Sequence, residues 1–330
     1  MSRSDAKSAA VSRPGKKKRD LKADLFLCKK HFKRDWQLHL LNLVPFLWVI
    51  IFCYGPMYGV QIAFRDFNIR QGILGSEWVG LKWFEKFLTS YQFSQVFSNT
   101  IKLSLYSLAV GFPLSIIFSL LLNSVQNEKF KKAVQTISYI PHFISVTVLV
   151  AILNMVFNPV GGLYGAIYRA LGGEGYPFDF RSMASSFRHL YVWSGVWQNL
   201  GWNSIIYMAA LSSVSQELHE AAMIDGASRW KRILHIDFPA ILPTACIMLI
   251  MDCGSILSVG FEKVYLMQGN LNLQTSEVIS TYVYKVGMGS SGDFSYGSAV
   301  GLFNSIINCT MLILVNYICK RLTDKEVSLF

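Results

Sequence analysis

Residues 220–243 read EAAMIDGASRWKRILHIDFPAILP, and they decide how the whole chain is interpreted. This stretch lies between two long apolar segments, yet it carries acidic and basic side chains, a glycine and prolines. Its start is rich in good helix formers, and Gly226 permits a sharp turn because glycine adopts positive φ. Ser228 suits the N-cap of a second short helix through Ile236, and Pro239 suits the first turn of the next span. The stretch therefore predicts a helix, a turn and a second helix.

The small and charged side chains of this stretch indicate a docking surface. Ala221 and Ala222 would let another backbone approach closely, and the acids and bases around them would form an exposed rim. Such a surface suits a helix that inserts into a groove of a partner. An amphipathic connector that rests on the membrane has the same composition. The spacing alone leaves both interpretations open.

The composition indicates a membrane protein. Of the 330 residues, 52% are hydrophobic and only 15% are charged, whereas a soluble domain carries about 25% charged residues. One membrane domain can hold a chain of this length, so the length does not require a second domain.

Six apolar segments have the length that a bilayer requires. A hydrocarbon core of about 30 Å needs about 20 mostly apolar residues per helix. The candidate spans are residues 38–58, 97–123, 134–157, 191–214, 240–261 and 299–319. We therefore expect an all-α polytopic membrane protein with about six transmembrane helices.

The net charge of +11 is concentrated in segments that flank these spans. A dense basic arm at 1–37, the connections at 124–133 and 216–239 and the tail at 321–330 all contain Lys or Arg. The positive-inside rule places all four on the cytoplasmic side, together with both termini. The predicted organisation is a basic cytoplasmic arm at 1–37, a transmembrane domain at 38–320 that includes the 216–239 loop, and a cytoplasmic tail at 321–330.

The order of residues in the opening stretch resembles the EAA motif of ABC-importer permeases. Its three parts are Glu220-Ala221-Ala222, Asp225-Gly226-Ala227 and Ile236-Asp237-Phe238-Pro239. The family usually ends this motif with Ile-x-Leu-Pro, so Phe238 is a departure. The resemblance extends from about Leu38 to Arg321. It is closest to binding-protein-dependent sugar permeases and, within them, to importers of alginate and pectin fragments.

The resemblance implies a type I ABC-importer permease fold and a set of partners. These are a second, similar permease, two cytoplasmic ATP-binding cassette subunits and an external solute-binding protein that delivers an oligosaccharide. ATP and Mg²⁺ would bind to the ATPase subunits, so no cofactor is expected in this chain. The implied location is the bacterial cytoplasmic (inner) membrane, with multiple passes.

The EAA stretch would be the helix that fits a cleft on one ATPase. The resemblance assigns this coupling role to Glu220, Ala221, Ala222, Asp225, Gly226 and Pro239. Closure of the ATPases would push the helix as a near-rigid lever. The pathway would then switch between inward-facing and outward-facing by a rocking motion of packed helices.

The sequence carries no motif for chemistry of its own. It contains neither a G-x-x-x-x-G-K-[ST] phosphate loop nor an H-E-x-x-H pair, and its histidines lack metal-ligand spacing. We therefore expect a transport subunit without a catalytic or metal site. His219 and His235 are interpreted as surface residues of the coupling stretch.

Polar residues within the predicted spans are candidates for the sugar pathway, because polar groups in a membrane face a cavity or a partner. They are Gln198, Asn199, Trp202, Asn203, Asp252, Ser255, Ser258 and Asn304. Amides hydrogen-bond hydroxyls in both directions, and an indole face stacks on a pyranose. In related sugar permeases the region of the first four lines the binding cavity. Hydrogen bonds to helices of the partner permease explain Asp252, Ser255 and Ser258 equally well. An interfacial aromatic belt also explains Trp202.

Three other functions compete with the importer. An ATP-independent secondary sugar transporter would need a complete pathway in one chain or a symmetric oligomer, and it would not explain the EAA spacing. A membrane-embedded glycan transferase would need an acidic metal site, whereas the predicted outer loops contain only scattered acids. The basic arm also suits nucleic acid, but no recognition motif accompanies it, so no nucleic-acid partner is expected.

Overall fold

The computed structural model describes residues 34–289 and 292–322. Residues 1–33 of the predicted arm and residues 323–330 of the predicted tail lie outside the described residues, so both segments remain predictions. The chain divides into two compact units, Met1–Gly59 and Val60–Phe330, and each unit is described by itself.

The described part of the first unit is an apolar helix. α2 (Trp36–Val49) continues through a π-helical turn (Ile50–Tyr54) into α3 (Gly55–Met57). Every residue of α2 is exposed, although most of its side chains are apolar. Apolar side chains on all sides suit a helix in lipid, in agreement with the span predicted at 38–58. The π turn precedes Pro56, whose missing N–H interrupts the regular hydrogen-bond ladder.

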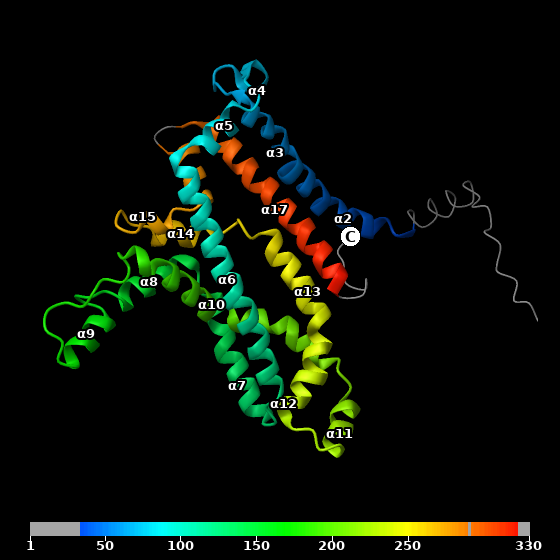
Figure 1. Ribbon diagram of the computed structural model, residues 1–330. Coiled ribbons are helices and arrows are strands. Elements are labelled where there is room, and N and C mark those ends of the chain that lie inside the picture. The colour runs from blue at the N-terminus through cyan, green and yellow to red at the C-terminus, as the bar shows by residue number, and fades with distance from the viewer. Residues whose placement is uncertain (1–33, 290–291, 323–330) are drawn as a thin grey trace, which may run out of the picture. The chain divides into compact units, whose positions relative to one another are not determined.

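Long helices form the frame of the second unit. They are α6 (Tyr91–Asn123), α10 (Ala184–Ser212), α13 (Phe238–Gly254) and α17 (Phe294–Leu322). α10 packs along α6 and contacts α13, which in turn packs against α17 (Figure 1). Ile116, Tyr207 and Ile241 are buried where the first three of these helices meet. Because lipid is as apolar as these side chains, the helices are held by close packing and hydrogen bonds rather than by the hydrophobic effect.

A cap of short elements closes one end of the second unit. It comprises a 3₁₀ segment that crosses the unit boundary (Tyr58–Phe64), β1 (Arg65–Asp66), α4 (Gly72–Gly75), β2 (Glu77–Trp78) and α5 (Lys82–Thr89). The two strands pair antiparallel, with Arg65 opposite Trp78. Phe87 of α5 is buried against Tyr282 and Tyr296, which lie on α16 (Ile279–Gly287) and α17. This aromatic contact fixes the cap to the long helices.

Most of the predicted spans are confirmed as helices. Among the described residues, four segments are long and apolar enough to cross a membrane. They are Trp36–Phe64, Tyr91–Asn123, Arg229–Gly254 and Phe294–Arg321. They correspond to the first, second, fifth and sixth predicted spans, and the mostly helical polytopic fold is therefore confirmed.

The third predicted span, 134–157, is not one straight helix. α7 (Glu128–Tyr139) ends in a short 3₁₀ turn, and α8 (Val146–Val156) then leaves at an angle of 100° to the preceding helix. Pro141 lies in the turn, where its ring and missing N–H oppose a continuous helix. The Ser145 side chain accepts a hydrogen bond from the Val148 N–H and so begins the new helix.

The fourth predicted span, 191–214, lies in α10, which is long enough to span but too polar to rank with the four apolar segments. Its polar side chains have partners within the protein. Arg188 donates to the Asn99 side chain at 2.9 Å, and Gln198 donates to the Ile144 carbonyl at 2.8 Å. The polar side of α10 thus faces protein, so the helix can carry polar residues that would be costly in contact with lipid.

The fifth predicted span, 240–261, ends early, because α13 stops at Gly254. The chain then passes through short helices, α14 (Phe261–Met267) and α15 (Leu273–Ser276), before α16. The Asn272 side chain is buried in this connection and donates to the carbonyls of Arg181 and Met267. α9 (Leu163–Ala170) belongs to the connection between α8 and α10.

The close contact between α7 and α10 gives a test of this packing. A Cβ atom added at Gly201 would overlap the Ser138 carbonyl, whereas a Cβ at Gly301 of α17 would meet nothing within 4 Å. We expect Gly201→Ala to lower the free energy of unfolding by about 1–3 kcal/mol through overpacking. Gly301→Ala, as the matched control, should leave stability unchanged or slightly raise it, because alanine is the better helix former. Thermal unfolding in detergent measures both, and equal midpoints would contradict the contact.

Candidate functional site

The EAA segment, residues 215–239, contains the predicted helix and turn. α11 (Gln216–Ile224) begins at Ser215, whose side chain accepts a hydrogen bond from the Glu217 N–H. The helix ends at Gly226, which has φ of 76°. The Gly226 N–H donates to the Met223 carbonyl at 3.1 Å, and the Ala227 N–H donates to the Ala222 carbonyl at 2.8 Å. This pair of bonds is a Schellman motif, which requires the left-handed conformation that glycine adopts without strain.

The second helix of the EAA segment continues into the membrane helix. α12 (Arg229–Arg232) is capped by Ser228, as predicted, and passes through a π-helical turn (Ile233–Asp237) into α13. Pro239 lies in the first turn of α13, also as predicted. The backbone is helical from α12 to the end of α13, with the π-helical turn between them and Pro243 inside α13.

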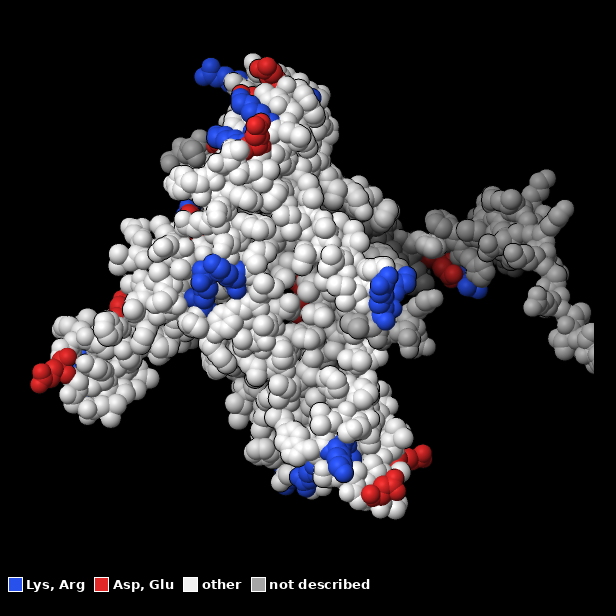
Figure 2. All heavy atoms as spheres, in the orientation of Figure 1, with Lys and Arg blue, Asp and Glu red and all other residues white. Residues whose placement is uncertain are grey.

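The tip of the EAA segment is open to contact. Glu220, Asp225 and Gly226 are exposed, and so are two large apolar side chains, Ile224 at 87% and Trp230 at 65%. Figure 2 shows acidic and basic side chains gathered at this end of the second unit, where Figure 1 places α11 and α12. Exposed apolar groups with a charged rim are typical of a protein-binding surface.

A contact between His219 and the buried Asp237, beneath the tip, was not predicted. The His219 Nε2 atom lies 3.2 Å from an oxygen of Asp237, whose side chain is almost fully buried. The Asn123 amide at the end of α6 lies 3.5 Å from the same oxygen. The interpretation of His219 as a surface residue is therefore wrong, because it joins α11 to the base of α13. His235 is exposed, as expected.

The signal for this pair was present in the sequence. Asp237 stands between Ile236 and Phe238, and a carboxylate among apolar residues at a membrane boundary requires a partner. A polar cavity of about 380 Å³ adjoins the pair and also includes Arg229. Arg229 donates to Gln126 at 3.3 Å, which links α12 to the connection between α6 and α7.

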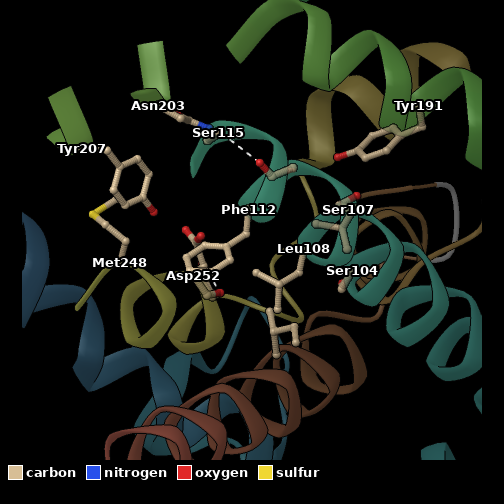
Figure 3. A pocket seen from close by; sticks show the side chains of 14 residues that line it. Ser104, Ser107, Leu108, Phe112, Ser115, Tyr191, Asn203, Tyr207, Met248 and Asp252 are labelled. Carbon is tan, nitrogen blue, oxygen red and sulfur yellow. Dashed lines mark hydrogen bonds between the residues drawn. The ribbon is translucent and has the colours of Figure 1, made fainter. Parts of the chain in front are cut away.

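A second cavity, which we call the membrane cavity, lies between α6, α10 and α13. It has a volume of about 280 Å³ and is lined by polar groups from all three helices (Figure 3). Asn203 and Tyr207 come from α10, and Asp252 comes from α13. Figure 3 shows the Tyr207 hydroxyl and the Asp252 carboxylate pointing into the same space.

Serines of α6 supply the third wall, and they were missed in the sequence. Ser104, Ser107 and Ser115 line the membrane cavity together with Gly111. These positions recur every three or four residues and so share one face of a helix. A stripe of small polar residues within an apolar span was the available signal.

The adjoining cavity, of about 330 Å³, shares walls with the membrane cavity, among them Ser107, Tyr191 and Asn203. Gln198 and Asn199 line it, as predicted for the pathway. Both amides also bond to the segment before α8, since Gln198 donates to Ile144 and Asn199 lies 3.0 Å from the ring nitrogen of His142. The two cavities together contain five of the eight predicted pathway residues: Gln198, Asn199, Asn203, Asp252 and Ser255.

The other three predicted pathway residues lie elsewhere. Trp202 stacks on the His142 ring, with centroids 4.2 Å apart. Ser258 accepts a hydrogen bond from the Asn308 side chain at 2.9 Å, which joins it to α17. Asn304 lines a different pocket, beside α16. For Ser258, helix-to-helix bonding is therefore the better explanation.

Comparison with known proteins places this arrangement in a family. The sequence profile described as the binding-protein-dependent transport system inner membrane component matches residues 111–324, which include the EAA segment and most residues that line the two cavities. This chain belongs to that family. The resemblance based on the EAA motif is thereby confirmed, and the chain is a multi-pass permease component of a bacterial membrane transport system.

Individual relatives in this permease family are also similar over most of their length. Protein LplB of Bacillus subtilis (strain 168) is 40% identical over 294 residues, covering 89% of this chain and 91% of LplB. YteP of the same organism, a permease protein of a polygalacturonan/rhamnogalacturonan transport system, is 39% identical over 290 residues, covering 88% of this chain and 89% of YteP.

Solved structures agree with the fold of this permease. A chain from a bacterial ABC transporter involved in the import of the acidic polysaccharide alginate superimposes with a TM-score of 0.81 at 34% identity, covering 90% of this chain and 99% of that one. A bacterial alginate ABC transporter in complex with an alginate pentasaccharide-bound periplasmic protein gives a TM-score of 0.82 at 33% identity, covering 91% and 99%. The type I importer permease architecture is therefore confirmed.

The contact between His219 and Asp237 can be tested by a double-mutant cycle. We expect His219→Ala and Asp237→Ala each to lower the thermal midpoint, and the double variant to lose little more than either single one. The coupling energy between contacting residues is about 0.5–3 kcal/mol. His235→Ala, an exposed histidine in the same segment, serves as the control. Additive losses would show that His219 and Asp237 act independently.

Proposed function

We propose that this chain is the transmembrane subunit of an ATP-driven importer and forms half of the pathway for an oligosaccharide. An external solute-binding protein delivers the sugar, and a second permease forms the other half. Two ATPase subunits bind ATP and Mg²⁺ and hydrolyse the ATP, while this subunit performs no catalysis. The observation that carries the proposal is the exposed EAA segment, continuous with a helix that lines a polar membrane cavity, in a chain of this family.

The EAA segment acts as the coupling element. Glu220 and the exposed tip contact one ATPase, Ala221 and Ala222 allow close approach, and Gly226 closes the turn. Because the backbone from α12 to α13 is helical throughout, a push on the tip is transmitted to α13. The His219–Asp237 pair supports this, since it holds α11 on α13. The motion reaches Asp252 and Ser255 at the membrane cavity, so the sugar pathway opens or closes with the ATPases.

The membrane cavity and the adjoining cavity form this subunit's share of the sugar pathway. Hydroxyls and amides, such as those of Ser107 and Asn203, exchange hydrogen bonds with sugar hydroxyls without binding them tightly. Similarity to the alginate transporter and to YteP supports an acidic oligosaccharide as the cargo. The orientation follows from the same assignment, because an EAA segment that meets the ATPases lies in the cytoplasm, together with both termini.

The coupling role predicts a specific transport defect. In the complete complex in proteoliposomes, we expect Glu220→Lys to abolish substrate-stimulated ATP hydrolysis and uptake, while the protein still assembles. Gly226→Val should have the same effect, because a β-branched residue at positive φ costs about 1–3 kcal/mol of backbone strain. Glu128→Lys, a charge reversal at another exposed acid, is the control. Normal substrate-stimulated hydrolysis in the Glu220 variant would contradict coupling through this segment.

The pathway role predicts a contrast between two polar residues. Asn203→Leu removes an amide from both cavities and should reduce the uptake rate about tenfold, as expected for the loss of about 1.5 kcal/mol of hydrogen bonding. Ser258→Ala removes a hydroxyl that faces Asn308 and should leave the uptake rate unchanged. Initial rates of labelled oligosaccharide uptake measure both, and a larger defect at Ser258 would place the pathway elsewhere.

A further inference from the structure

A buried lysine lies beside the adjoining cavity, and nothing above gives it a function. Lys263 lies on α14, and only 7% of its surface is exposed. Its Nζ atom donates to the Tyr191 carbonyl at 2.9 Å and lies 4.7 Å from the centre of the Tyr191 ring. An ammonium group has three N–H donors, so this carbonyl accepts only one of them.

Lys263 has no carboxylate partner in the described part of the chain. The neighbouring acid, Glu262, instead accepts a hydrogen bond from Thr147 at 3.2 Å. A partly buried lysine nearby in the chain does have such a partner, since Lys285 lies 2.8 Å from Glu277. A charge removed from water without a counterion is costly, and in membrane proteins such residues mark ligand pathways.

The ammonium faces a space that a ligand can enter. Lys263 lines the adjoining cavity together with Asn199 and Asn203, and this cavity shares walls with the membrane cavity. A Cβ atom added at Gly195 of α10 would come within 3.2 Å of Nζ. Glycine inside a helix costs about 0.5–1 kcal/mol relative to alanine. Gly195 thus leaves the room that the lysine head group occupies.

The other ionisable group nearby is the carboxyl group of Asp252, which lines the membrane cavity and not the adjoining one. Lys263 and Asp252 therefore line different cavities. An anionic group that enters beside Lys263 and the amides meets a cation and hydrogen-bond donors there.

We propose that Lys263 binds the carboxylate of uronate residues as the sugar passes and gives this subunit a preference for acidic oligosaccharides. This inference rests on the proposed function, and it adds the residue that distinguishes acidic from neutral sugars. Two N–H groups of Nζ are directed to the carboxylate while the third stays on the Tyr191 carbonyl. The amides of Asn199 and Asn203 meet the neighbouring hydroxyls, and a neutral sugar leaves the ammonium without a counterion.

The test uses the complete complex with its binding protein in proteoliposomes. The probes are labelled trigalacturonate and an alginate trisaccharide as acidic sugars, with maltotriose as a neutral one. We expect Lys263→Met to lower uptake of the acidic probes about 10- to 100-fold, the usual effect of losing a hydrogen bond to a charged group. Lys263→Arg should restore most of it. Lys285→Met, which removes an ion-paired lysine outside both cavities, should leave the preference unchanged.

Two further readouts separate a structural role from recognition. Lys263→Met should lower uptake of the acidic probes much more than uptake of maltotriose, because an apolar side chain of similar length fills the buried site but offers no charge to a carboxylate. If that variant fails to assemble, Lys263→Gln decides, since it keeps an N–H donor but removes the charge, and it should raise the KM for acidic probes several-fold with little change in kcat.

The outcomes distinguish this inference from the proposed function. Acidic uptake that is unchanged in Lys263→Met, or a KM for acidic probes that is unchanged in Lys263→Gln, overturns the inference and leaves an importer with a structural lysine. A wild-type complex that carries only maltotriose also overturns the inference but keeps the importer. A wild-type complex that carries no oligosaccharide overturns the proposed function itself.

Discussion

The polar face of α10 is the constraint on which the second unit depends. A polar group inside a membrane must bond within the protein or face water. Arg188 meets this demand through Asn99 of α6, and Gln198 meets it through the Ile144 carbonyl, just beyond the break at Pro141. These bonds hold α10 between α6 and the bent third segment. The polar face of α10 thus accounts for its close packing with α6 and for its contact with the segment that follows the break at Pro141.

The same demand organises the end of the second unit that carries the EAA segment. Asp237 is buried at the base of α13, and its carboxylate is held by His219 of α11 and lies close to Asn123 of α6. The position of the EAA tip is thus fixed by a residue beneath it, while the tip keeps exposed groups such as Glu220 and Ile224 for contact. A segment that is rigid at its base and open at its tip suits the transmission of force between subunits.

The membrane cavity and the adjoining cavity are lined by hydroxyl and amide groups, and each also has one ionisable side chain, Asp252 in the first and Lys263 in the second. A transport pathway must bind its cargo well enough to admit it and loosely enough to release it. The serines of α6 and the Asn203 amide offer the weak contacts that release requires, and the Lys263 ammonium offers the stronger attraction that entry requires. Tyr191 touches both cavities and also supplies the carbonyl that positions the lysine, so one residue joins the two functions.

The sequence by itself determined the class of protein, most of its spans and the EAA segment. It could do so because apolar length, charge bias and the turn at Gly226 are local properties, each set by neighbouring residues. Only the tertiary structure decided which polar residues face a cavity. Ser258 and Asp252 look alike as polar groups in one apolar span, yet one bonds Asn308 and the other lines the membrane cavity. The His219–Asp237 pair and the unpaired Lys263 likewise depend on helices brought together from distant parts of the chain, and no local pattern encodes such distances.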